Sequence, residues 1–173
     1  MGISYSNTDG KLNLKRYSQE VKKFLKKKNI KIIFEPGRSI IGDTAVLISK
    51  IIYIKKSANK KFVILDAGMN DLMRPALYGA KHQIVPLKKT NKKITGNIEF
   101  VGPICENSDK FLSKTIFPKI EEQDYVCLTH VGAYGMSLSS NYNIRPTVAE
   151  IMVSGSKHKL IKKRQNLKDL IKN

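Results

Sequence analysis

The sequence predicts a mainly β protein, in which a C-terminal β-sandwich or barrel-like domain follows one α–β unit of a TIM-type (β/α)8 barrel. Three observations support this fold class. Residues 14–28 carry apolar side chains at helical spacing, and residues 30–34 form a short run rich in isoleucine. After residue 38, short apolar runs alternate with turn residues, as in mainly β domains. With 173 residues, 41% of them hydrophobic, the chain is long enough to bury a core.

The α–β unit occupies the start of the chain. Asp9-Gly10 predicts a turn, and Asn13 can cap the helix that follows. The side chains on one face of this helix, which should end near Lys28, are Leu14, Tyr17, Val21, Phe24 and Leu25. Residues 30–34 then predict a mostly buried strand. Because one such unit cannot close a sheet, the pattern indicates one unit of a larger, truncated barrel.

The β domain is predicted from a series of short runs. Strands are expected at residues 44–55, 61–66, 94–101, 125–129, 147–153 and 158–161, with a turn around Asn59. Residues 167–171 predict a short terminal helix. We find no internal repeats and no low-complexity linker in the sequence.

The net charge of +18 raises the possibility of a lysine-rich β domain that binds polyanions. The lysines are spread along the chain, however, so we favour a lysine-coated surface and expect no nucleic-acid partner. Cys105 and Cys127 form neither a CxxC pair nor a metal-binding spacing, so no metal site is expected. The sequence shows no signal peptide and no run of membrane-spanning length, and we expect a cytoplasmic protein with no membrane partner.

Four motifs combine glycine or proline with charged, aromatic or thiol side chains. They are Glu35-Pro36-Gly37-Arg38-Ser39, residues 66–78, residues 102–109, and Gly132-Ala133-Tyr134-Gly135 running into residues 139–146. Gly37 would let backbone N–H groups approach a phosphate, and Arg38 adds a charged fork, although a plain turn would also explain both residues. Arg74 and Tyr78 together could bind a carboxylate, although a packed loop is the simpler explanation.

The last two motifs contain a thiol and a flanked tyrosine. Cys105 could act as a general acid, although a lone cysteine is more often a small buried hydrophobe. Tyr134 lies between Gly132 and Gly135, where the backbone can approach a ligand, although a core tyrosine at a turn fits as well. Cys127 lies inside an apolar run and is expected in the core.

In order and spacing, the four motifs resemble those of the diaminopimelate decarboxylases, a family of alanine-racemase-like pyridoxal-phosphate enzymes. The resemblance covers nearly the whole chain. It implies pyridoxal 5'-phosphate-dependent decarboxylation of meso-2,6-diaminopimelate to L-lysine and CO2 in lysine biosynthesis, by a homodimer with shared active sites. It divides the chain into residues 1–38, a remnant of the last helix and strand of the cofactor-binding barrel; residues 39–162, a C-terminal β domain; and residues 163–173, a basic tail with a short helix.

The resemblance also implies roles for individual residues. Cys105 corresponds to the proton donor, and Glu106 to a contact with the distal amine of the substrate. The other substrate-binding positions are Arg38, Arg74, Tyr78 and Tyr134, and the cofactor-binding positions are Glu35, Pro36, Gly37, Arg38 and Tyr134. Asn141, Asn143 and Arg145 are expected to brace the loop of Tyr134, and His82 and His130 receive no role.

The resemblance leaves the cofactor lysine unaccounted for, and two other functions remain open. The family's cofactor lysine lies on an early barrel strand, which would precede Met1, so we expect the 173-residue chain to be inactive alone. A related decarboxylase of another basic amino acid or of carboxynorspermidine would carry similar motifs. Relatives that act on simple diamine precursors tend to carry aspartate after the cysteine, so Glu106 favours diaminopimelate. The polyanion-binding β domain leaves the four motifs unexplained.

Overall fold

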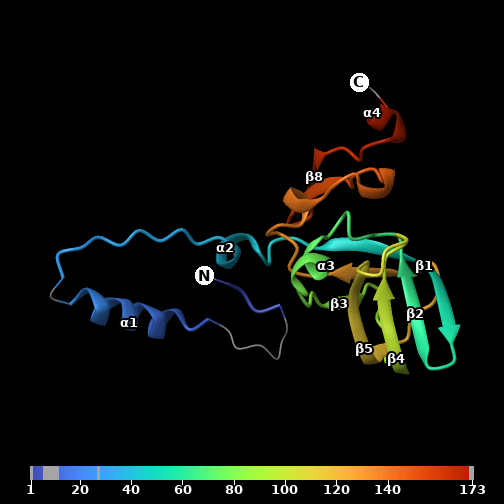
Figure 1. The fold of residues 1–173 in the computed structure, drawn as a ribbon, viewed down its shortest axis with the longest axis horizontal. Helices are drawn as coiled ribbons and strands as arrows, with labels where there is room; N and C mark the ends of the chain where they lie inside the picture. The colour runs from blue at the N-terminus through green and yellow to red at the C-terminus, as the bar shows by residue number, and fades with distance from the viewer. Residues whose placement is uncertain (1, 6–11, 27, 172–173) are drawn as a thin grey trace.

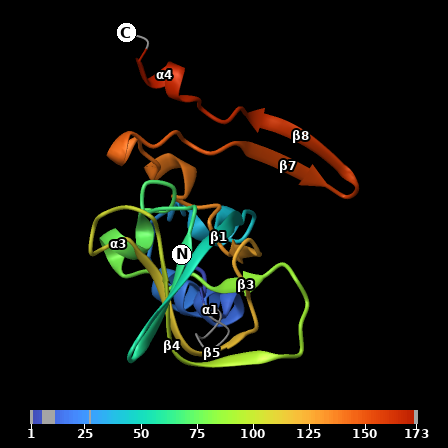
Figure 2. The same cartoon turned by 90° about the vertical axis from the view of Figure 1, so that its right-hand side faces the viewer.

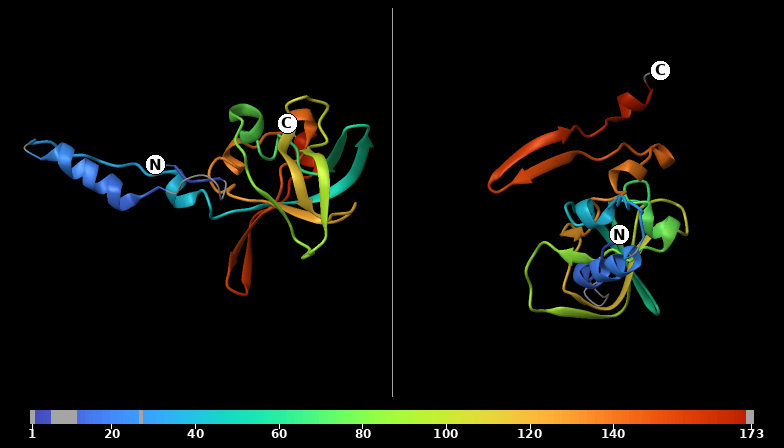
Figure 3. Two further views of the ribbon diagram at one scale, coloured as in Figure 1. Left: turned by 90° about the horizontal axis from the view of Figure 1, so that it is seen from below. Right: turned by 90° about the vertical axis from the view of Figure 1, so that its left-hand side faces the viewer.

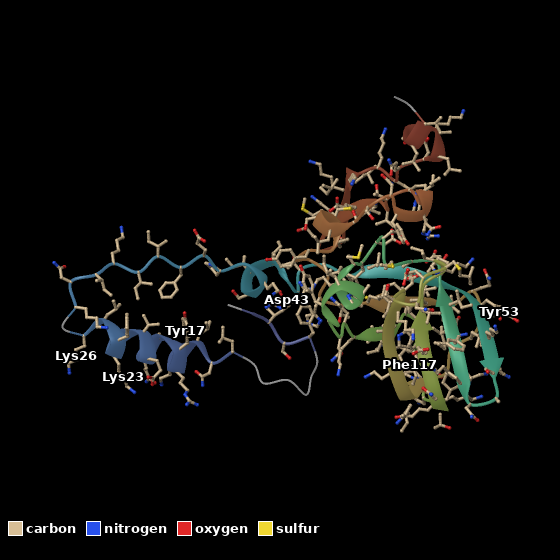
Figure 4. All side chains as sticks on the ribbon, in the orientation of Figure 1. Tyr17, Lys23, Lys26, Asp43, Tyr53 and Phe117 are labelled. Atoms are coloured by element: carbon tan, nitrogen blue, oxygen red, sulfur yellow. The ribbon has the colours of Figure 1, made fainter. Side chains whose placement is uncertain are left out.

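An N-terminal arm, a six-stranded sheet and a C-terminal hairpin follow one another along the chain (Figure 1). The computed structural model describes residues 2–5, 12–26 and 28–171. The arm consists of helix α1 (Leu14–Leu25) and the irregular segment 28–37. Views from two sides both show it projecting away from the sheet (Figures 1 and 3). Tyr17, Lys23 and Lys26 lie on this arm, far from Phe117 in the sheet (Figure 4).

The sheet confirms the mainly β fold class. Its strands are β1 (Leu47–Ser57), β2 (Lys60–Leu65), β3 (Ile84–Pro86), β4 (Lys93–Val101), β5 (Lys110–Pro118) and β6 (Tyr125–Leu128), in the order β3-β6-β1-β2-β4-β5. All neighbours are antiparallel except β2 and β4. The first half of β1 pairs with β6 and the second half pairs with β2, and a register shift separates the halves between Ile51 and Tyr53. Such a bulge bends a strand, so β1 turns the sheet around its core.

The core lies on the inner face of this bent sheet, and in β2 the buried Val63 and Leu65 alternate with the half-buried Phe62 and Ile64. The rings of Phe100 and Phe117 pack with centroids 4.7 Å apart across β4 and β5. The buried apolar side chains are Ile51, Val63, Leu65, Ala67, Leu72, Ile84, Ile98, Phe100, Phe111, Phe117, Ile120, Val126, Leu128 and Val131. Cys127 is also buried, as predicted from its apolar run.

Helix α1 forms as predicted but ends earlier. The side chain of Asn13 caps it by accepting a hydrogen bond from the backbone N–H of Arg16, at 2.9 Å. The helix ends at Leu25 instead of near Lys28. None of its side chains is buried, so its apolar face has no partner within the described part of the chain. The turn predicted at Asp9-Gly10 lies outside the described residues.

The predicted strand at residues 30–34 is wrong. The segment has no ladder partner among the described residues, and Ile33 is 78% exposed. A strand exists only through hydrogen bonds to a neighbour, and a buried strand also needs packing on both faces. The arm runs out from the sheet (Figure 1), and within the described residues neither condition is met.

The C-terminal region forms a separate hairpin. Strands β7 (Glu150–Ser154) and β8 (Lys157–Lys162) pair with each other, and Gly155 at φ +58° makes the turn between them. Figure 2 shows this hairpin standing away from the six-stranded sheet, with helix α4 (Leu167–Ile171) after it. Both strands and the helix match predicted ranges closely. In the described residues, no helix has the length and apolar character needed to cross a membrane.

Candidate functional site

The four sequence motifs meet around the loop that follows β2. The backbone N–H of Met69 donates to Asp109 Oδ1 at 2.7 Å, which joins the second motif to the third. The carbonyl of Asn70 accepts from the N–H of Ser140 at 2.9 Å, which joins the second motif to the fourth. The N–H of Gly132 donates to the carbonyl of Gly42 at 3.1 Å, close to the first motif. Segments far apart in sequence thus share one end of the sheet.

The most distinctive group at this end is the guanidinium of Arg74. Arg74 begins the short helix α3 (Arg74–Tyr78), which Pro75 helps to start and Gly79 ends at φ +62°. The side chain is only 8% exposed. Its guanidinium carbon lies 5.3, 5.4 and 5.5 Å from the ring centroids of Tyr5, Tyr134 and Tyr78. We call these three rings and Arg74 the tyrosine box.

The tyrosine box contains a cation without an anion. No carboxylate in the described residues forms an ion pair with Arg74, and its buried Nε has no hydrogen-bond partner there. Arginine presents a planar fork that matches a carboxylate or phosphate in a bidentate manner. The geometry therefore suits an anionic ligand whose charge the protein itself does not supply.

Tyr134 reaches the box from a tight backbone turn. Its φ of +62° is unusual for a residue other than glycine, and the residue is 48% exposed. A Cβ on Gly132 would collide with the carbonyl oxygen of Ile41, so the loop can approach the start of the β domain only because residue 132 is glycine. The ring is thereby placed against Arg74 while one side stays open to a ligand.

The loop that carries Cys105 is fixed by Asp109. This carboxylate accepts from the N–H groups of Met69 and Ile104, at 2.7 and 2.8 Å, and a Cβ on Gly102 would collide with it. Burial raises the pKa of the Asp109 carboxyl above its ordinary value, and the two backbone hydrogen bonds oppose that effect. Asp109 is thus a buried anchor for the loop.

Cys105 and Glu106 line a pocket that is open to solvent, together with Ile104 and Asn107. The carboxylate of Glu106 accepts hydrogen bonds from the backbone N–H and the hydroxyl of Ser108, at 3.2 and 3.1 Å. In the described part of the chain, no hydrogen bond, ion pair or ring contact joins Cys105 or Glu106 to the tyrosine box. The chain thus carries two separate candidate sites.

The first motif lies beside the tyrosine box. Arg38 begins helix α2 (Arg38–Ile41), and its guanidinium carbon lies 5.9 Å from the centroid of the Tyr5 ring. A Cβ added to Gly37 would meet no atom within 4 Å, so the backbone there is open to a ligand. Glu35 is exposed, and its carboxylate has no partner in the described residues.

A polar network braces the loops, as predicted for Asn141 and Arg145. Arg145 donates to the Asn70 side chain through Nε, at 3.1 Å, and to the carbonyl of Asp66. Asn141 Nδ2 donates to the carbonyl of Arg145 at 2.8 Å. Burial raises the pKa of Asp71, although its hydrogen bond from the N–H of Gly68 acts against the shift. Asn143 contributes a left-handed backbone at φ +61°.

Two residues of the site were not predicted from the sequence. Tyr5 belongs to the tyrosine box, and His82 is fully buried beneath it, with ring centroids 4.8 Å apart. The carbonyl of Thr129 accepts from His82 Nδ1 at 2.9 Å, so that nitrogen carries the proton. Burial lowers the pKa of His82, which keeps the imidazole neutral near pH 7. Neither residue lies in one of the four motifs.

The residues present fit part of a pyridoxal-phosphate site. The open flank of Gly37, with Arg38 beside it, suits the phosphate, and the exposed ring of Tyr134 suits the aromatic part. A lysine that binds this cofactor covalently must lose its proton, which burial promotes. None of the lysines in the described residues is buried. The described residues thus offer surfaces that suit an edge of the cofactor, but no candidate for its covalent anchor.

Comparisons with known proteins point to one family. Residues 9–132 match the model of the family described as pyridoxal-dependent decarboxylase, C-terminal sheet domain. The diaminopimelate decarboxylase of Helicobacter pylori is 42% identical over 170 residues, which cover 98% of this chain and 42% of that protein. The Aquifex aeolicus enzyme of the same name is 40% identical over 96% of this chain and 39% of its own length. The chain thus spans about two-fifths of these relatives.

Solved structures give the same result. The crystal structure of the H. pylori diaminopimelate decarboxylase complexed with L-lysine superposes with a TM-score of 0.87 at 42% identity, over 98% of this chain and 41% of that one. The M. jannaschii diaminopimelate decarboxylase superposes with a TM-score of 0.91 at 35% identity, over 99% and 40% of the two chains. A lysine/ornithine decarboxylase from Vibrio vulnificus, at 18% identity and a TM-score of 0.70, shares the fold.

Proposed function

Because this chain belongs to the pyridoxal-dependent decarboxylases, whose C-terminal sheet domain it contains, we propose that it supplies the substrate-reading part of a diaminopimelate decarboxylase. The observation that carries this proposal is Arg74, a buried cation held by three tyrosine rings without an acidic partner. A substrate with a second amino-acid end presents the missing carboxylate. The Arg74 fork and the Tyr78 hydroxyl would bind it.

Substrate meso-2,6-diaminopimelate differs from simple diamine precursors by that second carboxylate, which remains on the product L-lysine. Bound pyridoxal phosphate would act as the electron sink for the loss of CO2. Glu35, Pro36, Gly37, Arg38 and Tyr134 would contact the cofactor, and Arg38 and Tyr134 would also reach the substrate. Cys105 would hold, at Sγ, the proton that replaces the lost carboxylate.

The separation of the two candidate sites supports a homodimer. Glu106 would accept a hydrogen bond from the distal amine, yet neither Glu106 nor Cys105 contacts the tyrosine box in the described part of this chain. In a two-fold symmetric dimer, the Cys105 loop of one copy would complete the site that contains Arg74 of the other copy. An active site shared between two copies would explain why the two halves of the chemistry lie apart in one chain.

A binding experiment on the 173-residue chain tests the role of Arg74. L-lysine and cadaverine differ only in the carboxylate, so the chain should bind L-lysine more tightly in calorimetric titrations. Arg74→Gln should weaken L-lysine binding by about ten- to hundredfold, the effect of losing a charged hydrogen bond, and leave cadaverine binding unchanged. Arg16→Gln removes the same charge from the exposed helix α1 and serves as the matched control. Equal binding of both ligands to the unmodified chain would contradict the proposal.

A further inference from the structure

The N-terminal segment packs against the site through Tyr5. Its side chain is only 8% exposed, although it lies far from the sheet in sequence. Its ring meets the rings of His82 and His130 edge to face, with centroids 4.8 and 6.0 Å away and interplanar angles of 66° and 69°. The hydroxyl is buried, with no hydrogen-bond partner in the described residues. Packing of the ring therefore holds Tyr5 in place.

The same ring faces two guanidinium groups from different motifs. Its centroid lies 5.3 Å from the guanidinium carbon of Arg74 and 5.9 Å from that of Arg38. Two positive charges thus contact one ring, and no acidic side chain in the described residues pairs with either. The negative face of an aromatic ring attracts a cation within about 6 Å. Tyr5 is the aromatic ring within that range of both cations among the described residues.

Gly2 adds a second contact between this segment and Arg38. A Cβ on Gly2 would lie 3.3 Å from Nη2 of Arg38, which is tighter than ordinary side-chain packing. The absence of a side chain at residue 2 thus leaves room for the guanidinium beside the Tyr5 ring. Arg38 is bordered by both described ends of the segment, residues 2 and 5.

We propose that Tyr5 is a positioning residue that holds Arg38 and Arg74 as one two-cation clamp for a single substrate carboxylate. The proposal rests on the proposed function, because it assigns a carboxylate to these arginines. Tyr5 itself acts through the two arginines: its ring reduces the cost of placing two cations together without an acid. A carboxylate that enters between them then completes the charge balance.

The arginine side chains offer a direct test of this geometry. The sequence contains five arginines, Arg16, Arg38, Arg74, Arg145 and Arg164, so NMR should resolve five side-chain Nε–Hε signals. Nearby rings shift such signals through their ring currents. Tyr5→Leu should move the Arg38 and Arg74 signals together and leave that of Arg16 unchanged. Tyr134→Leu, which removes a ring that faces only Arg74, should move the Arg74 signal and spare Arg38.

Two further variants separate positioning from packing. Tyr5→Phe keeps the ring and loses only a hydroxyl without a partner, so its spectrum and its L-lysine affinity should match the unmodified chain. Tyr5→Leu should weaken L-lysine binding about three- to tenfold, the range expected for a desolvated cation–π contact, and leave cadaverine binding unchanged. Tyr53→Leu, at an exposed site on β1, controls for the loss of a tyrosine.

The outcomes are distinguishable. If the Arg38 and Arg74 signals do not move together in Tyr5→Leu, or if Tyr5→Phe moves them equally, the positioning role is overturned. If they move together but L-lysine perturbs neither signal in the unmodified chain, the carboxylate assignment is overturned and the proposed function fails with it. Urea unfolding of each variant checks that the sheet is intact. If Tyr5→Leu does not fold, Tyr5→Ile replaces it in the same measurements. Gly2→Ala, which places a methyl group against Arg38, then tests the Arg38 signal separately.

Discussion

At the scale of single residues, the site is organised by charges that lack their usual partners. Burying an unpaired cation such as Arg74 costs free energy, because the group loses its hydration. Each of the three ring contacts stabilises the cation by about 0.5–2 kcal/mol, which offsets part of that cost. The remainder is available to a ligand carboxylate, which gains more from Arg74 than it would from an arginine already paired with an acid. The selectivity that we propose for a carboxylate-bearing substrate would follow from this imbalance.

The two cysteines should differ in reactivity. Cys105 is exposed in an open pocket, whereas Cys127 is buried in β6, where burial raises the pKa of its thiol. Because the thiolate is the reactive form, iodoacetamide at neutral pH should label Cys105 in the folded chain and leave Cys127 unmodified until urea unfolds it. Peptide mass spectrometry measures both sites, and Cys105→Ser is the control. Labelling of Cys127 as fast as Cys105 in the folded chain would contradict this difference.

Asp109 should make the stability of the chain depend on pH. Burial raises the pKa of this carboxyl above 3.8, so the folded state binds its proton more tightly than the unfolded state does. Its contribution to the free energy of unfolding is therefore full below pH 3.8 and is lost as pH rises through the raised pKa. Asp109→Asn cannot titrate. The stability of the unmodified chain relative to this variant, from urea unfolding, should therefore increase as pH falls; a decrease would contradict the sign.

Sequence patterns predicted only those site residues that lie in motifs. Arg74, Tyr78 and Tyr134 were predicted from the motifs and do meet in one box. Tyr5 was missed because it stands in a short segment without periodicity, and its importance arises only from contacts with distant residues. The anchoring role of Asp109 was likewise hidden, because one of its two donors is the backbone of Met69, forty residues away.

At the scale of elements, the strands that were predicted correctly are those with a clear apolar face. The strand β5 was missed because exposed polar residues such as Lys114 and Thr115 interrupt its apolar pattern, and its pairing with β4 cannot be read from local sequence. The strand expected at residues 30–34 failed for the opposite reason. Its apolar pattern is strong, but the described chain provides no neighbouring strand to pair with it. The apolar pattern of a segment therefore predicts a strand correctly only where the rest of the chain supplies a neighbouring strand for it to pair with.

The contact between the Gly132 loop and the start of the β domain gives a test at this scale. Gly132→Ala would place a methyl group against the backbone carbonyl of Ile41, which cannot move without displacing helix α2. We expect a loss of about 1–3 kcal/mol in the free energy of unfolding. Gly37→Ala is the matched control, because a Cβ there meets no atom within 4 Å and its φ of −103° is negative. Its stability should change by less than about 0.5 kcal/mol.

This pair of variants also reports on function. If the loop is displaced, the Tyr134 ring should leave Arg74, and the Arg74 Nε–Hε signal should move in Gly132→Ala but not in Gly37→Ala. An equal loss of stability in both variants would show that the close approach of the loop to Ile41 does not matter.

At the scale of the whole molecule, the chain combines a well-packed sheet with an arm whose apolar side chains are exposed. Helix α1 buries none of its residues, and Ile30, Ile33 and Phe34 are also exposed. Contiguous apolar surface of this kind is typical of a region that contacts further protein. The candidate sites show the same property, since the tyrosine box and the Cys105 pocket both open to solvent.

We therefore expect the 173-residue chain to release no CO2 from meso-2,6-diaminopimelate when it is supplied with pyridoxal phosphate alone. None of the lysines in the described residues is buried, and burial is what promotes the loss of a lysine proton. An ammonium group cannot attack the cofactor aldehyde. Trapping labelled CO2 measures the rate, and cofactor without protein gives the background. Release well above that background, and its loss in Cys105→Ser, would mean that the chain itself supplies the covalent anchor. Release that appears only after a barrel-bearing chain is added would place that anchor outside this chain.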